Sequence, residues 1–195
     1  MAKKKYVFTN DYMFCYVLSS KPELAKELIE LILGVEIESV DVVEQQKVLN
    51  YDISAHSVRL DVYLKNSKEI FDVEMQTSDK HDLPRRMRYY QGANAYDDLK
   101  KGNDYNGLKN CYVIFLCSFD PFGKGDAIYR FVTKNDKYED IEFDDGAYSL
   151  IINSRSSEQN IPKELKNFLL YLSSGEVTDE FTSRIQAVVD QVNEN

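Results

Sequence analysis

The chain has 195 residues, of which 43% are hydrophobic, so it is long enough for one domain with a sizeable core or for one domain plus a small appendage. Its formal charge of −9, from 24 basic and 33 acidic residues, argues against a protein that coats nucleic acid by bulk electrostatics, although it permits a local basic patch. No apolar run approaches the ~20 residues of a membrane span, and the three cysteines lie in apolar company, so we expect a cytoplasmic protein without membrane contact or disulfides.

The first 50 residues predict two helices and a strand. Asp11 is a plausible N-cap for a short helix over 12–18. Residues 20–23 have capping-box spacing with proline in the first turn, which predicts a longer amphipathic helix that ends at Gly34. Residues 39–48 are rich in β-prone side chains and predict a strand.

Two further strands, over 58–65 and 69–77, are separated by a tight polar turn and predict a hairpin. Side chains alternate between the two faces of a strand, so Asp72, Glu74 and Gln76 share one face. A hairpin would bring Asp61 beside that polar face. Carboxylates gathered in this way repel one another unless a hard divalent cation with oxygen ligands neutralises them, so the pattern indicates a metal site.

A basic helix is predicted directly after these strands. Asp82 can cap it, Pro84 lies in its first turn and Gly102 closes it after Lys101. Its start is rich in cations, since residues 80–88 hold four basic residues and one acidic one: Lys80, Arg85, Arg86, Arg88 and Asp82. A solvated charged face is the alternative interpretation of this segment.

The rest of the chain predicts a buried central strand over 111–117, two hairpin-paired strands over 128–133 and 147–152, and two amphipathic C-terminal helices. The whole predicts an α/β fold with a mixed central sheet. We divide it into a core over 1–155 and a C-terminal helical extension over 156–195.

The order of elements and several short motifs resemble the PD-(D/E)XK nuclease superfamily, and specifically its Rpn recombination-promoting nuclease or putative-transposase family. Asp61 with Glu74-x-Gln76 is similar to the acidic motif, residues 10–14 to the N-terminal block and residues 86–90 to the Arg-x-x-x-Tyr helix. Residues 101–108 are also similar. The resemblance implies a restriction-endonuclease-like core, with a mixed central sheet flanked by helices.

The resemblance also implies a DNA endonuclease that uses Mg²⁺ or Mn²⁺ to hydrolyse phosphodiester bonds. Asp61 and Glu74 would bind the metal, and Gln76 would position water. Gln76 stands where the superfamily motif has lysine, and an amide can form hydrogen bonds but carries no charge. The residues implied to contact DNA are Arg86, Tyr90, Arg85 and Lys80, and two acidic residues are additional candidates: Asp11 and Asp72.

Several alternatives stay open at this point. Asp61 could instead be a surface carboxylate paired with Arg59, and Asp11 could serve only as a helix cap. The chain could be a catalytically weak or inactive relative that binds DNA or protein, for which Gln76 and the acidic surface are the arguments. A retaining glycosidase also uses two carboxylates, but the chain has no tryptophan for a sugar platform. Cutting both strands of a duplex would favour a homodimer.

Overall fold

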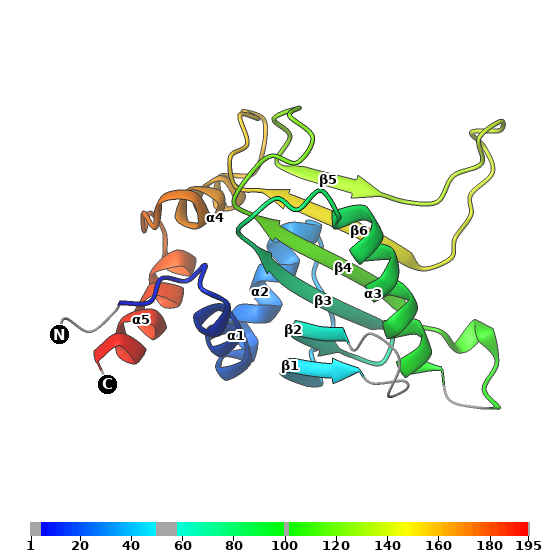
Figure 1. Cartoon of the computed structure of the whole chain (residues 1–195), viewed down its shortest axis with the longest axis horizontal. Coiled ribbons are helices and arrows are strands. Elements are labelled where there is room, and N and C mark those ends of the chain that lie inside the picture. The colour runs from blue at the N-terminus through cyan, green and yellow to red at the C-terminus, as the bar shows by residue number, and fades with distance from the viewer. Residues whose placement is uncertain (1–4, 50–57, 100–101, 195) are drawn as a thin grey trace.

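The computed structural model describes residues 5–49, 58–99 and 102–194, and it has a six-stranded mixed sheet with helices on both faces (Figure 1). The strand order is β1-β2-β3-β4-β6-β5. This architecture confirms the predicted α/β class. Among the residues that the structure describes, no helix is long and apolar enough to cross a membrane.

The first three strands form the predicted antiparallel meander: β1 (Val42–Leu49), β2 (Val58–Lys65) and β3 (Glu69–Gln76). The β2–β3 hairpin has the predicted turn, because the Asn66 side chain accepts hydrogen bonds from the N–H groups of Lys68 and Glu69 at 2.8 and 2.7 Å. β1 begins three residues later than predicted.

The other three strands extend the sheet beyond β3. The buried strand β4 (Asn110–Cys117) pairs with β3 in parallel over its whole length, and helix α3 (Leu83–Asp98) with the short 3₁₀ helix η1 (Tyr105–Gly107) forms the crossover. β6 (Ala147–Asn153) lies between β4 and the edge strand β5 (Ile128–Phe131). β5 and β6 are antiparallel neighbours, as predicted.

The first two helices are present, but both predicted caps are wrong. Helix α1 (Asp11–Ser20) is capped by Asn10, whose side chain accepts a hydrogen bond from the Met13 N–H at 3.3 Å, so Asp11 is already its first residue. The capping box before α2 (Pro22–Leu33) does not form, because the Ser20 hydroxyl donates to the Val17 carbonyl oxygen instead. Gly34 ends α2 with φ +70°, a conformation that suits glycine.

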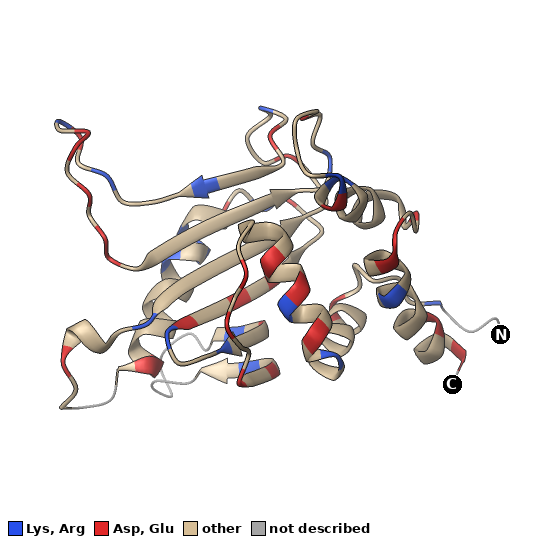
Figure 2. Ribbon diagram, turned by 180° about the vertical axis from the view of Figure 1, so that it is seen from behind, with Lys and Arg blue, Asp and Glu red and all other residues tan. Residues whose placement is uncertain are grey.

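One face of the sheet is covered by four helices: α1, α2, α4 (Lys163–Ser174) and α5 (Glu180–Glu194). Phe168 of α4 and Ile185 of α5 are fully buried in the same hydrophobic cluster as Phe14, Phe71 and Val73. The helices predicted as an extension therefore contribute to the main core, while a domain boundary at residue 155 remains a prediction. Seen from behind, this face carries acidic helices: α2 and α5 each have three acidic residues and one basic residue (Figure 2).

Helix α3 covers the opposite face, where Tyr63, Phe115 and Met87 are buried together. The side chains of β2 do not alternate strictly between the two faces of the sheet. Leu60 packs in this cluster, whereas Val62, two residues later, packs on the opposite face. Tyr89 and Tyr96 of α3 are 46% and 69% exposed. α3 ends at Asp98, and the predicted end at Lys101 lies outside the described residues.

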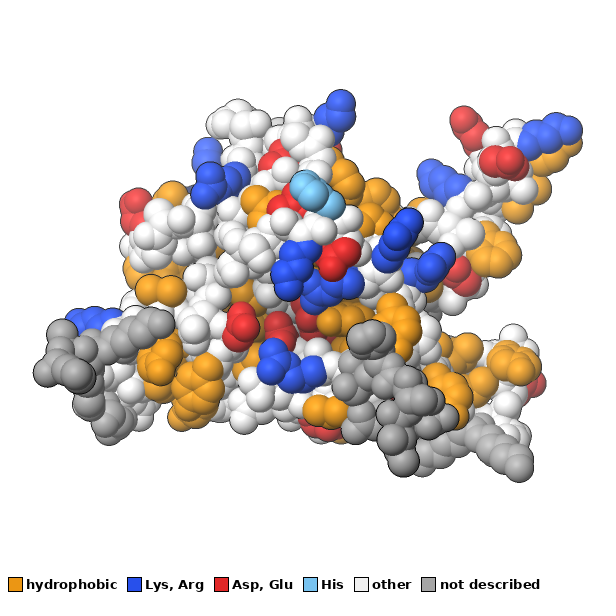
Figure 3. Space-filling model, in the orientation of Figure 1, with side chains coloured by type: hydrophobic (Ala, Val, Ile, Leu, Met, Phe, Trp, Pro, Cys, Tyr) orange, Lys and Arg blue, Asp and Glu red, His pale blue; other side chains and the backbone are white. Residues whose placement is uncertain are grey.

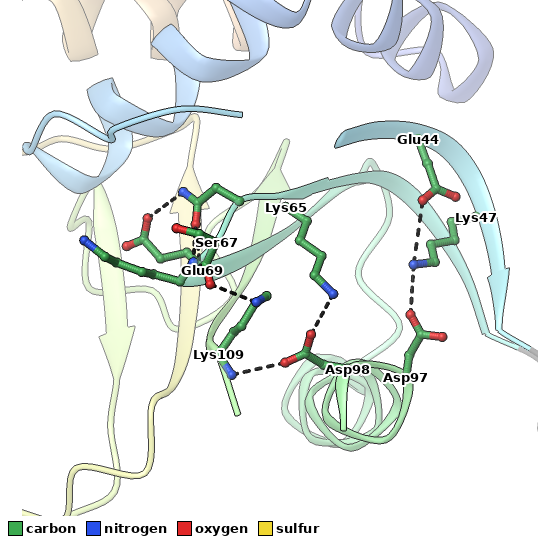
Figure 4. A network of polar contacts seen from close by, with 10 residues as sticks. Glu44, Lys47, Lys65, Ser67, Glu69, Asp97, Asp98 and Lys109 are labelled. Carbon is green, nitrogen blue, oxygen red and sulfur yellow. Dashed lines mark hydrogen bonds and ion pairs between the residues drawn. The ribbon is translucent and has the colours of Figure 1, made fainter. Parts of the chain in front are cut away.

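Ion pairs join the last turn of α3 to the meander (Figure 4). Lys65 on β2 contacts Asp98 at 2.6 Å, and Lys47 on β1 contacts Asp97 at 2.9 Å. Asp98 also accepts a hydrogen bond from the backbone N–H of Lys109 at 3.2 Å. These contacts fix the far end of the helix whose first turns face the site described next.

The three cysteines are free and buried, as their apolar neighbours predicted. Cys15 lies on α1, whereas Cys111 and Cys117 lie on β4 under α3. Burial raises the pKa of the Cys15 and Cys117 thiols to about 12, and it raises that of Cys111 further.

Candidate metal and phosphodiester site

The polar site forms where two strands of the meander separate. The β2–β3 ladder runs from Lys65 opposite Ile70 to Val62 opposite Val73, and it ends one residue before Asp61 and Glu74 would pair. On the other side of β2, the facing residue Gln46 has φ +50°, a left-handed conformation that is uncommon without glycine. The backbone N–H groups at this opening therefore need acceptors other than the neighbouring strand.

Two carboxylates supply those acceptors. The Asp61 N–H donates to Glu74 Oε1 at 2.8 Å, and the Met75 N–H donates to Asp61 Oδ2 at 3.3 Å. The backbone of β2 thus binds the carboxylate of Glu74, and the backbone of β3 binds the carboxylate of Asp61. The structure brings together the two residues that the sequence predicted as metal ligands, although they are 13 positions apart.

Ionisation of the two acidic side chains is unfavourable in this site. Asp61 and Glu74 are 6% and 3% exposed. Burial raises the pKa of both, with further contributions from Asp11 to Asp61 and from Asp72 and Asp61 to Glu74. Burial and the neighbouring carboxylates thus both disfavour the ionised forms of Asp61 and Glu74, and a bound cation would offset this cost.

Asp72 lies beneath the site rather than in it. Its side chain is fully buried, and Oδ2 accepts a hydrogen bond from Asn94 Nδ2 of α3 at 3.2 Å, whereas Oδ1 has no partner. Burial raises the pKa of Asp72 to about 7. A proton shared with Glu74 would give the unpartnered oxygen its hydrogen bond, so Asp72 would support Glu74 from below the cleft.

Gln76 and Arg86 form the cationic side of the site. Gln76 Oε1 accepts a hydrogen bond from Arg86 Nη1 at 2.7 Å, and the Gln76 amide nitrogen donates to the Ser78 carbonyl oxygen. Arg86 Nη2 donates to Tyr90 Oη at 3.2 Å and lies 3.6 Å from Glu74 Oε2. The glutamine therefore orients an arginine at the point where the superfamily motif carries a lysine.

These groups line a cleft of about 690 Å³. Figure 3 shows acidic side chains recessed between basic ones on this face of the molecule. The lining includes seven of the nine residues singled out from the sequence: Asp11, Asp61, Glu74, Gln76, Lys80, Arg86 and Tyr90. Of the other two, Asp72 lies below the cleft and Arg85 lies on the outer side of α3, in a different concavity.

Two side chains that contact the acidic residues of the site were not singled out from the sequence. Arg59 lines the cleft, with Nη2 3.9 Å from Asp61 Oδ1, and the sequence analysis considered it only as an alternative partner of Asp61. Asn94 holds Asp72. It could have been found from spacing, because Arg86, Tyr90 and Asn94 follow one another at intervals of four on one helix face.

The donor set fits a hard divalent cation. The acidic groups of the cleft offer oxygen ligands, and among the residues described no cluster of three His, Cys, Asp or Glu side chains has metal-binding geometry. Mg²⁺ is commonly held by one or two carboxylates, with waters and substrate phosphate completing its octahedron. Asp61 and Glu74 match that arrangement better than a closed three- or four-residue cage, which a structural zinc ion would require.

Comparison with known proteins gives one match. A search of curated proteins and a search of solved structures each find none. The model of the PD-(D/E)XK nuclease family transposase family matches residues 8–173, a span that contains the meander, the cleft, α3 and most of α4. The chain therefore belongs to the PD-(D/E)XK nuclease family transposases, which supports a nuclease-like function.

Proposed function

We propose that the protein is a metal-dependent DNA endonuclease of the recombination-promoting, transposase-like type, and that it uses Mg²⁺ or Mn²⁺. The observation that supports this most directly is the reciprocal pair of backbone-to-carboxylate hydrogen bonds between Asp61 and Glu74. These bonds fix two desolvated carboxylates on rigid strands, at the floor of a cleft that also contains cations. Such a floor is suited to a divalent ion and a phosphate.

Asp61 and Glu74 would hold the ion. When bound, a divalent cation would lower the pKa of water and offset charge on the phosphoryl oxygens. Arg86 is held in place by Gln76 and Tyr90, so its guanidinium can donate hydrogen bonds to a phosphate oxygen without first being ordered. Lys80 at the exposed rim would attract the DNA backbone.

Gln76 would position water. Its amide oxygen has a second lone pair beyond the one that Arg86 uses, and its nitrogen has a second N–H beyond the one donated to Ser78. The amide can therefore orient a water molecule while Arg86 supplies the positive charge that glutamine lacks. A division of labour between these two residues accounts for the absence of the motif lysine.

The second candidate function is a catalytically weak or inactive relative that binds DNA or protein. The specific observation in its favour is that Glu74 Oε1 is already occupied by the Asp61 N–H, so fewer carboxylate lone pairs face the cleft. Calorimetric titration with Mg²⁺ and Mn²⁺ separates the two functions. The nuclease requires binding that depends on Asp61 and Glu74, whereas a pure binding module does not.

Nicking of supercoiled plasmid tests the proposal, with Mg²⁺, Mn²⁺ or EDTA in parallel reactions. Asp61→Asn and Glu74→Gln should each reduce the rate by about 10²-fold or more, because the ion contributes several kcal/mol of transition-state stabilisation. Asp136→Asn, on the exposed loop after β5, is the matched control and should cut at the wild-type rate. Unchanged cleavage in either site variant would refute the assignment. A homodimer remains a prediction that sedimentation can check.

A further inference from the structure

The parallel strands β3, β4 and β6 end at the same edge of the sheet, beside the cleft (Figure 1). Their last residues are in register, since Gln76 is aligned with Cys117 and Cys117 with Asn153. Ligands of open α/β sheets commonly bind outside the carboxyl ends of parallel strands. A substrate that enters the cleft at Gln76 can therefore continue along this edge, over the ends of β4 and β6.

Arg155 lies in the turn directly after β6, and polar contacts hold the backbone of this turn. The Arg155 N–H donates to Asn153 Oδ1 at 2.9 Å, and the fully buried Asn153 side chain also donates to the Asp126 carbonyl oxygen at 3.0 Å. The next residue is held as well, because the Ser156 hydroxyl donates to the Gly125 carbonyl oxygen at 2.7 Å. The backbone of Arg155 is thus positioned before any ligand binds.

The Arg155 side chain extends from β6 toward the cleft. Its Nε donates to the carbonyl oxygen of Ser118, the residue after β4, at 2.8 Å. The Ser118 N–H donates to the Gln76 carbonyl oxygen at 3.0 Å, and the Ser118 hydroxyl donates to the Thr77 carbonyl oxygen at 3.1 Å. Gln76 and Thr77 line the cleft. A chain of hydrogen bonds therefore connects Arg155 with the cleft wall.

The bond from Nε leaves the outer part of the Arg155 guanidinium available. Among the residues that the structure describes, no carboxylate forms an ion pair with Arg155, and its side chain is exposed. The carboxylates of the adjacent loops have other partners: Glu158 accepts from the Ala127 N–H at 2.9 Å, and Asp120 accepts from three N–H groups of its own loop. The remaining N–H donors form a planar fork, which matches the oxygens of a phosphate.

We propose that Arg155 binds a second phosphate of the DNA backbone, beyond the strand ends, while Arg86 binds the scissile phosphate. This inference rests on the proposed nuclease function. Gln76 and Asn153 are separated by two strand spacings, or about 10 Å. Each strand of a duplex has one phosphate per about 3.4 Å of helix axis, so this distance spans roughly three phosphates. Both arginines can therefore bind the same strand, a few nucleotides apart.

Two substitutions separate the charge of Arg155 from its hydrogen bond to Ser118. Arg155→Gln places an amide nitrogen at the position of Nε, because both atoms follow Cδ, so it can keep the bond while it removes the cationic fork. Arg155→Ala removes both. The matched control is Arg130→Gln, since Arg130 lies over the ring of Tyr148, which packs against the core cluster on the face of the sheet opposite α3.

Fluorescence anisotropy with a labelled duplex in EDTA measures DNA binding without cleavage. Arg155→Gln and Arg155→Ala should each reduce the slope of log K against log salt by about 1, because one phosphate contact is lost. Arg130→Gln should keep the wild-type slope. Thermal melting checks the fold, and Arg155→Gln should melt at the wild-type temperature. A wild-type slope for Arg155→Gln would overturn the proposal, and so would an equal loss of slope in Arg130→Gln.

Nicking kinetics distinguish this proposal from the nuclease function. A phosphate at Arg155 does not react, so its contact is the same in the ground state and the transition state. Arg155→Gln should therefore raise KM about tenfold with little change in kcat, the effect of one lost charge-assisted hydrogen bond. A lower kcat at unchanged KM would place Arg155 at the reacting phosphate and overturn the proposal.

The two proposals can fail separately. A reduced salt slope in Arg155→Gln, in a protein that does not nick plasmid, would keep the phosphate site and remove the catalytic assignment. Nicking by the wild type, together with an unchanged slope in Arg155→Gln, would remove the Arg155 proposal alone.

Discussion

Arg86 joins three parts of the cleft: it contacts the Gln76 amide, the Glu74 carboxylate and the Tyr90 hydroxyl. The resemblance of residues 86–90 to the Arg-x-x-x-Tyr helix indicated the importance of Arg86, but the sequence gave no sign that Gln76 would be the residue that orients it. That hydrogen bond joins the end of a strand to the first turns of a helix. A pattern within one element cannot reveal a contact between two.

A graded pair of substitutions at Arg86 tests this geometry. Arg86→Ala should slow cleavage by about 10²- to 10³-fold, the usual effect of removing one preorganised donor. Arg86→Lys keeps the charge but cannot donate to Gln76 and Tyr90 at once, so its cleavage rate should lie between those of the wild type and Arg86→Ala. Single-turnover nicking rates check this. A rate for Arg86→Lys equal to that of the wild type would show that charge alone is sufficient.

Asp72 predicts a pH dependence of stability. Its folded-state pKa is raised from 3.8 to about 7, because burial disfavours the charged form. The folded state thus binds the proton more tightly than the unfolded state, and stability is lost as the pH rises from about 4 through 7. Asp72→Asn should remove this loss and raise the melting temperature at pH 8, by roughly 2–4 °C per kcal/mol.

The control for Asp72→Asn is the same comparison at pH 4, where the wild-type carboxyl is protonated in the folded state. There the variant should gain little, since an amide then replaces a neutral acid. Thermal denaturation followed by circular dichroism between pH 4 and 8 measures the difference. An equal gain at both ends of this range would contradict the raised pKa.

At the scale of elements, periodicity predicted β2 and β3 well and missed the feature that creates the site. The alternation of Asp72, Glu74 and Gln76 is that of an ordinary strand, and it correctly placed them on one face. The ladder opens at Asp61, where the facing residue Gln46 is left-handed and β3 continues beside its parallel partner β4. Neither leaves a mark in the sequence, because glutamine is not a typical left-handed residue.

The last turn of α3 gives a prediction about how the helix is held. Asp98→Ala should destabilise the protein by about 1–3 kcal/mol, because the side chain is 6% exposed and its loss leaves the Lys109 N–H without its acceptor. Asp97→Ala, in the same turn, breaks the ion pair with Lys47. Because the Asp97 side chain is 36% exposed, this loss should lower the free energy of unfolding by about 1 kcal/mol or less. Urea unfolding measures both. Equal losses in the free energy of unfolding would show that the burial of Asp98 adds nothing to stability.

At the scale of the whole molecule, the sequence predicted the strand succession and the C-terminal helices but not where those helices lie. Amphipathic stripes such as that of Phe168 show that a helix buries one face, yet any apolar surface could receive it. The structure uses α4 and α5 to complete the core over Phe71 and Val73. Long-range packing of this kind depends on the complete set of surfaces, which no local pattern contains.

Charge is distributed unevenly over the two faces. Of the helices behind the sheet, α2 and α5 are acidic (Figure 2), whereas Lys80 lines the cleft and Arg85 and Arg88 lie on α3 beside it. DNA should therefore approach from the α3 side, despite a net charge of −9.

Salt dependence of DNA binding checks this orientation. Lys80→Ala should reduce the slope of log K against log salt by about 1, because one phosphate contact is lost. Lys166→Ala, on exposed α4, is the matched control and should leave the slope unchanged. Equal slopes for Lys80→Ala and the wild type would place the DNA elsewhere.

The reactivity of the three buried cysteines can report when the helical layers detach from the sheet. Cys15 lies on one side of the sheet, and Cys111 and Cys117 lie on the other. A thiol with a pKa near 12 scarcely reacts with an alkylating reagent until its surroundings loosen and release it as a normal thiolate. The order in which the three sites become labelled in mild denaturant therefore tells which helical layer detaches first, without any engineered probe.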